Sequence, residues 1–113
     1  YIVEQYISGS GVKPVERFVL SGITDTQTKE AVLAGIIELG KRKGRLNNKS
    51  LETKHLRGKI FELKFIKQAV RILFAYHPQK RKCILLLHGI IKKRDDVKNR
   101  DIEIAEQRLG ELK

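Results

Sequence analysis

The stretch "CILLLHGIIKK", residues 83 to 93, decides the fold. It is apolar at consecutive positions, so a strand here presents apolar side chains on both of its faces. That pattern is typical of a central strand that is covered, at least in part, on both sides. The strand therefore needs neighbours, and it runs into positive charge at Lys92 and Lys93.

Two earlier runs have the alternation of half-buried strands. In "KIFELKFI", residues 59 to 66, and in "QAVRILFAY", residues 68 to 76, large apolar residues recur at every second position. The very short link between them predicts an antiparallel hairpin. "HPQKRK", residues 77 to 82, then turns the chain into the run 83–93, and Arg71 points away from the apolar face of its strand.

Two helices are predicted before the hairpin. "PVERFVLSG", residues 14 to 22, begins with proline, which suits the first turn of a helix. In "TDTQTKEAVLAGIIELGKRKG", residues 24 to 44, apolar residues lie near one another on one side of a helix. Thr24 and Gln27 have the spacing of a capping box at its start, and Gly44 suits its C-terminal cap.

The ends of the chain complete the order of elements. "YIVEQYI", residues 1 to 7, alternates well enough to be a strand. The polar residues 45 to 58 are predicted to form a connection, and Asn99 can cap a closing helix over residues 100 to 113. The order of an N-terminal strand, two helices, three antiparallel strands and a C-terminal helix predicts the α+β class. We expect one domain, residues 1–113, with the helices packed on one face of a twisted sheet.

The charge is large and unevenly distributed. The chain has 24 Lys and Arg against 13 Asp and Glu, a formal net charge of +11. Residues 41 to 100 hold 19 of the basic and four of the acidic side chains. This polarity indicates a polyanionic partner, although lysines can also serve solubility alone. Nucleic acid is favoured over a membrane, because no amphipathic helix combines a basic face with a broad apolar one.

The composition indicates a cytoplasmic protein without a cofactor. The single cysteine, Cys83, cannot form a disulfide within the chain, and its place in a strand favours a core side chain over a reactive thiol. Three scattered histidines and one cysteine provide no metal-ligand spacing. No apolar run approaches the roughly 20 residues that cross a bilayer.

The polar face of the hairpin carries the candidate chemistry. Glu62, Lys64 and Arg71 share the face opposite the aromatic residues, and His88 and Lys92 join them if the register to the third strand allows it. This set suits RNA cleavage by the ribose 2′-hydroxyl, which needs a base, an acid and cations around the phosphate. Arginine binds phosphate bidentately, and histidine titrates near neutral pH.

Each of these residues also has a structural interpretation. Arg71 can form a structural salt bridge, for instance with Glu62, and His88 can be a satisfied core residue. The lysines that end the third strand can be solvated charges. His55 lies in the polar connection beside other cations and is a weaker candidate for an RNA contact, and His77 is weaker still.

A series of short motifs carries a family resemblance. In order they are Lys54-x-Leu56, Phe61-Glu62-Leu63-Lys64, Arg71-Ile72-Leu73-Phe74, Leu86-Leu87-His88-Gly89-Ile90-Ile91-Lys92-Lys93, and Ile102-Glu103-Ile104-Ala105 with Arg108. The series resembles the phage-derived, HigB-like branch of the RelE/ParE superfamily of type II toxins, and "PVERFV" near Pro14 resembles the family's first helix. Phe61 stands where tryptophan is usual, Lys64 replaces arginine and Ile90 replaces phenylalanine. Lys64 keeps the charge but loses the bidentate fork of arginine.

The resemblance implies a RelE-like fold and a metal-independent endoribonuclease, an mRNA interferase that cleaves mRNA in the ribosomal A site. It implies no cofactor. The partners that it implies are the ribosome, mRNA and a cognate antitoxin, typically with a helix-turn-helix DNA-binding domain. The catalytic residues expected from it are Arg71, His88, Lys64, Glu62 and Lys92. The RNA-binding residues expected are Lys93, Arg94, His55, Arg57 and Lys59.

Two other functions fit the same scaffold. A ParE-like toxin inhibits DNA gyrase and cuts no RNA. A small nucleic-acid-binding module uses its cations only to anchor phosphates, and it predicts salt-sensitive binding without cleavage.

Overall fold

Strand β5 (Cys83–Ile91) lies inside the sheet and is paired on both sides, as its sequence predicts. The computed structural model describes residues 1–92 and 96–112. Its five-stranded sheet has the order β1-β5-β4-β3-β2, in which β1 runs parallel to β5 and the other neighbours are antiparallel. The other elements are β1 (Ile2–Gln5), α1 (Pro14–Arg17), the π-helical turn η1 (Phe18–Gly22), α2 (Thr26–Lys41), β2 (Leu51–Arg57), β3 (Ile60–Phe65), β4 (Val70–Tyr76) and α3 (Asn99–Gly110). The α+β class and the RelE-like fold are confirmed, with one strand more than the predicted order contains.

Strand β2 lies in the segment predicted to be a polar connection, so that prediction is wrong for residues 51 to 57. β2 forms the edge of the sheet and pairs antiparallel with β3. Its residues are half-buried or exposed, because an edge strand has a neighbour on one side only and is less covered than a central strand. Its sequence, LETKHLR, therefore lacks the apolar alternation that identifies strands β3 and β4.

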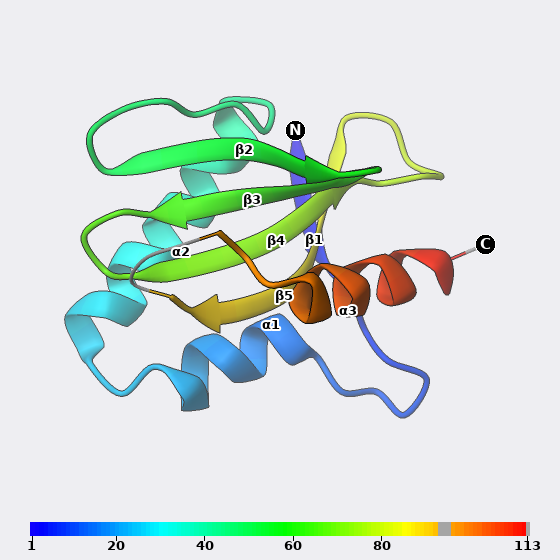
Figure 1. The fold of residues 1–113 in the computed structure, drawn as a ribbon, viewed down its shortest axis with the longest axis horizontal. Helices are drawn as coiled ribbons and strands as arrows, with labels where there is room; N and C mark the ends of the chain where they lie inside the picture. Colours follow the sequence, from blue (N-terminus) through cyan, green and yellow to red (C-terminus); the bar gives the residue numbers. More distant parts are fainter. Residues whose placement is uncertain (93–95, 113) are drawn as a thin grey trace.

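The sheet is covered on both faces, which corrects the expectation that all helices pack on one. One face packs against α1, η1 and α2 through a core that includes Val15, Val32 and Phe74. The other face packs against α3 through a core that includes Leu73 and Ile102. Figure 1 shows α3 in front of the sheet and α2 behind it. Within residues 1–92 and 96–112, no helix is both long and apolar enough to cross a bilayer.

The predicted N-caps of both long helices need correction by one residue. Asp25, not Thr24, caps α2, and its carboxylate accepts hydrogen bonds of 2.8 Å from the backbone N–H and the hydroxyl of Thr28. These bonds lower the pKa of Asp25. Helix α3 has Lys98 as its N-cap and no side-chain cap bond, so Asn99 is its first residue and does not cap it. The C-cap of α2 is Arg42, and the left-handed residue that follows it is Lys43, at a φ of 59°, so Gly44, at a φ of +82°, lies one position beyond the predicted capping role.

We predict that Gly35→Ala destabilises the fold. Gly35 lies in the buried side of α2, and a Cβ there would stand 2.2 Å and 2.8 Å from two ring atoms of Phe65. The overpacking should lower the free energy of unfolding by about 1–3 kcal/mol, measured by chemical denaturation. Gly110→Ala is the matched control, because nothing lies within 4 Å of a Cβ at this helical position. Equal stability of the two variants would contradict the close approach of α2 to β3.

Candidate functional site

The strand register brings the predicted polar residues onto one face of the sheet. Lys64 on β3 lies directly across from Arg71 on β4, and Glu62 lies across from Leu73. On the other side of β4, Leu73 lies across from His88. Residues on neighbouring strands at such positions have their Cβ atoms about 4.5–5.5 Å apart. Glu62, Lys64, Arg71 and His88 therefore share the face that α3 partly covers.

A β-bulge puts His88 on this face. The pairing of β4 with β5 shifts between Leu73, which faces His88, and Phe74, which faces Leu86, so Leu87 is the extra residue. Simple alternation would place His88 with Leu86, which belongs to the core under α1 and α2. Because of the bulge, His88 instead lies on the same face as Leu87, which belongs to the core under α3. The bulge thus settles the register that the sequence left open.

Arg71 and Glu62 form a buried ion pair at the centre of the face. Each residue is 3% exposed, and Nη1 of Arg71 donates to Oε2 of Glu62 over 3.1 Å. In the described part of the chain, these two are the only charged residues that are buried. The expectation that Arg71 projects from an uncovered side of the sheet is therefore wrong. Its alternative interpretation, a salt bridge with Glu62, is correct for this conformation.

Exposed and half-buried cations surround the pair. Lys64, directly across from Arg71, is half-buried. Lys54 lies across from Glu62 on β2, is exposed, and forms a 3.6 Å ion pair with Asp96. Lys92 is half-buried, and its backbone N–H donates to Ala69 over 2.7 Å beyond the end of β5. The predicted RNA contacts Lys93 and Arg94 lie outside the described residues.

His88 is held by helix α3 through both ring nitrogens. Nε2 lies 2.9 Å from Oδ1 of Asp101, and Nδ1 lies 3.3 Å from Nη1 of Arg108, which also donates to the carbonyl of Leu87 over 2.7 Å. Arginine can only donate, so Nδ1 accepts and the proton of a neutral ring is assigned to Nε2. In this conformation His88 fastens α3 to β5. Catalysis by His88 stays a prediction that requires it to leave one of these partners.

The expected RNA contacts on β2 and its turn do not join this site. His55 pairs with Phe61 on the opposite face of the sheet, where the two ring centroids are 5.0 Å apart. Arg57 reaches α3 and donates to Oε1 of Glu106 over 2.6 Å. Lys59 is exposed in the turn before β3. Only the tertiary fold reveals such partners, since no local spacing relates Arg57 to Glu106.

Cys83 belongs to the interior of the protein. Cys83 is 4% exposed, and burial raises the pKa of its thiol, which confirms its interpretation as a core residue. Across residues 1–92 and 96–112, His, Cys, Asp and Glu side chains form no group of three or more that could hold a metal ion. What this face offers is a carboxylate and a guanidinium surrounded by lysines.

The comparison with known proteins places the chain in a family. Residues 24–110 match the family described as phage derived protein Gp49-like (DUF891). No curated protein is significantly similar to the chain. The match spans most of the sequence, from the start of α2 to the end of α3, and includes all of the candidate site. The chain therefore belongs to the phage-derived Gp49-like family, a toxin-like family of the RelE/Gp49 type.

Proposed function

We propose that this protein is the toxin of a type II toxin-antitoxin system, of the HigB-like branch, and that it cleaves mRNA in the ribosomal A site without a metal ion. The observation that carries the proposal is the contact of Arg71 with Glu62 beside Lys64. It joins a potential base to two potential phosphate ligands in a small basic protein of a toxin-like family. The partners proposed are the ribosome, mRNA and a cognate antitoxin with a helix-turn-helix domain.

Cleavage begins with an exchange of partners at the buried pair. An incoming phosphate competes with Glu62 for the guanidinium of Arg71, which binds either anion through charge-assisted hydrogen bonds. Glu62, released from Arg71, then accepts the proton of the ribose 2′-hydroxyl as its oxygen attacks phosphorus. Lys64 and Arg71 offset the negative charge that develops on the phosphate oxygens.

The second half of the reaction needs an acid. The bond from phosphorus to the 5′-oxygen breaks, and that oxygen takes a proton, which leaves a 2′,3′-cyclic phosphate and a 5′-hydroxyl. The proton comes from Lys92 or His88, which lie at or near the end of β5. His88 serves only if it separates from Asp101, to which its Nε2 is now bound.

The antitoxin has an apolar surface to contact on the opposite side of the molecule. Leu20, Leu33 and Ile37 are 59%, 49% and 60% exposed, and they line a groove of about 670 Å³ between η1 and α2. Exposed apolar clusters of this kind mark protein interaction sites. We propose this groove as the contact for an apolar segment of the antitoxin.

Removal of Glu62 should destabilise the protein strongly. Glu62→Ala takes the carboxylate from a buried guanidinium, and we expect a loss of about 3–5 kcal/mol in the free energy of unfolding. The double variant Glu62→Leu with Arg71→Met should recover most of that loss, because apolar residues of similar volume often replace a buried ion pair without cost. Chemical denaturation of the three proteins measures both effects. Equal stability of the single and double variants would contradict the burial of the pair.

The same double variant tests the reaction. In a purified translation system with a defined message, the parent should produce new 3′ ends in phase with codons. Glu62→Leu with Arg71→Met should lower the cleavage rate by about 10²-fold or more, since it removes both a phosphate ligand and the base. Lys13→Ala, an exposed cation before α1, is the control and should cleave like the parent.

Two outcomes would reject the nuclease. An intact message together with inhibited supercoiling by DNA gyrase would favour the ParE-like activity. An intact message with unaffected gyrase would leave a nucleic-acid-binding module.

Charged residues in the apolar groove should prevent inhibition by the antitoxin and leave toxicity intact. Leu33→Asp with Ile37→Asp places two carboxylates where side chains are already exposed, so the fold should persist. Co-expression of the antitoxin should then no longer restore growth, while the cleavage activity of the variant stays at the parent's level. The matched control is Gln27→Asp with Ala34→Asp, which adds two carboxylates at exposed positions of α2 that do not line the groove. Full rescue of the groove variant by the antitoxin would contradict this contact.

A further inference from the structure

A row of aromatic rings lies on the sheet face opposite the Arg71–Glu62 pair. His55, Phe61 and Phe74 are neighbours across β2, β3 and β4. Ring centroids are 5.0 Å apart for His55 and Phe61, 5.6 Å for Phe61 and Tyr76, and 6.4 Å for Tyr76 and Tyr1. Tyr1 is 45% exposed, Tyr76 is 37% exposed, and His55 is also exposed. Phe74 is buried beneath them, so the row is an extension of the core that reaches solvent.

The rings of Tyr76 and His55 are fixed in place. The hydroxyl of Tyr76 donates to the carbonyl of Lys43 over 3.0 Å. Gly44 leaves room for this hydroxyl, since a Cβ there would stand 2.5 Å from it. Nε2 of His55 lies 2.7 Å from the carbonyl of Gly58 in the turn that follows β2. Rings held in this way lose little side-chain entropy when a flat ligand packs on them.

Basic residues flank the two tyrosines on both sides. One hollow beside Tyr1 and Tyr76 is lined by Arg42, Lys43 and Arg45, which follow α2. A second hollow beside the same two rings includes the loop between β4 and β5, with its cations Lys80, Arg81 and Lys82. The tyrosine pair thus lies between two cationic segments that are far apart in the sequence.

Most of these cations are not neutralised. Glu38 pairs with Arg42, and Glu4 pairs with Lys80, whose pKa this contact raises. Among the residues that the structure describes, no carboxylate lies within ion-pair distance of the remaining four. The four are Lys43, Arg45, Arg81 and Lys82.

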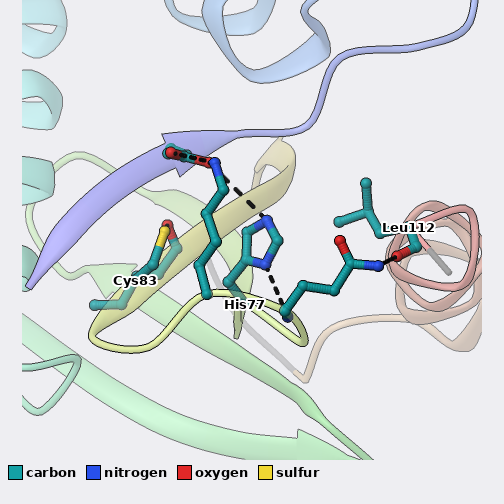
Figure 2. A network of polar contacts seen from close by, with 7 residues as sticks. His77, Cys83 and Leu112 are labelled. Atoms are coloured by element: carbon teal, nitrogen blue, oxygen red, sulfur yellow. Dashed lines mark hydrogen bonds and ion pairs between the residues drawn. The ribbon is translucent and has the colours of Figure 1, made fainter.

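The loop that carries Arg81 and Lys82 is anchored at several points, as Figure 2 shows. Nδ1 of His77 accepts from the backbone N–H of Gln79 over 3.1 Å, and the side chain of Gln79 donates to the carbonyl of Leu112. Lys80 donates to Glu4 of β1 over 2.9 Å. These contacts hold the loop against the first strand and the segment after α3, so its cations are positioned before any ligand arrives.

We propose that this aromatic and basic surface binds a short segment of single-stranded RNA. Bases that are not paired can stack on the exposed rings of His55, Tyr76 and Tyr1, while the flanking cations contact the phosphates. Duplex RNA does not fit this chemistry, because its bases already stack on one another. The choice of RNA over DNA rests on the proposed function, whereas the stacking surface does not.

The test uses a labelled ten-nucleotide uridine-rich RNA with 2′-O-methyl groups, which the protein can bind but cannot cleave. Lys43 and Lys82 have left-handed backbone conformations, with φ of 59° and 52°. Glycine adopts such angles without strain, so Lys43→Gly with Lys82→Gly removes two cations while leaving the fold at least as stable. Fluorescence anisotropy should show an affinity at least about tenfold weaker, and a slope of log affinity against log salt shallower by about 1.4.

Matched variants separate stacking from charge. Lys13→Ala with Lys29→Ala lowers the net charge equally. Because these two cations line neither hollow, the affinity should stay within about twofold of the parent's. His55→Ala should weaken binding about fivefold or more with an unchanged salt slope, because it removes a ring and no phosphate contact. Tyr76→Phe keeps its ring and loses only the hydrogen bond to the carbonyl of Lys43, so it should weaken binding less than His55→Ala does.

Three results would overturn the inference: equal effects of the two double-lysine variants, equal competition by duplex RNA, or no binding by the parent. Failure of the proposed function looks different. A parent that binds RNA through Lys43, Lys82 and His55, but leaves mRNA intact during translation, would reject the nuclease and keep this surface.

Discussion

The buried pair of Arg71 and Glu62 is the constraint on which the rest of the structure depends. Removing two charges from water costs several kcal/mol for each ion, so a fold that buries them must bring them together with good geometry. Glu62 faces Leu73 and Arg71 faces Lys64, which makes the ion pair a diagonal contact between β3 and β4. A one-residue slip would break this contact and turn the aromatic side chains out of their core. The pair therefore specifies the register of the hairpin.

The bulge in β5 extends that constraint to helix α3. It turns His88 toward the face of the ion pair, where Asp101 and Arg108 of α3 bind both nitrogens of its ring. Arg57 and Glu106 add a second link between the sheet and the same helix. The candidate site is therefore bounded by α3, and a movement of this helix would change the exposure of the face and the freedom of His88 together.

The sequence predicted the elements whose pattern depends on burial, and it failed where position depends on tertiary contacts. β5 and the β3–β4 hairpin were recognisable because their apolar residues follow the period of a strand. β2 was missed because an edge strand has no comparable pattern. Alternation placed Arg71 on the correct face, but it contains no information on whether a face is covered, so its burial was not foreseen. The apolar side of α3 was evident, yet amphipathicity does not say which face of the sheet a helix packs against. His88 was assigned a chemical role from its motif, and its partners became visible only in the fold.

Strand alternation also explains how one small sheet carries two different surfaces. Along β3, Phe61 points to one face while Glu62 and Lys64 point to the other. Along the edge strand β2, His55 lies on the aromatic side and Lys54 lies across from Glu62 on the opposite side. β2 is thus the border at which the proposed stacking surface and the proposed cleavage site meet. A strand of RNA that crosses this edge can stack its bases on one face and present a phosphate to the other. The polar sequence that concealed β2 as a strand is what such a crossing requires, since an apolar edge would exclude the solvated backbone of the RNA.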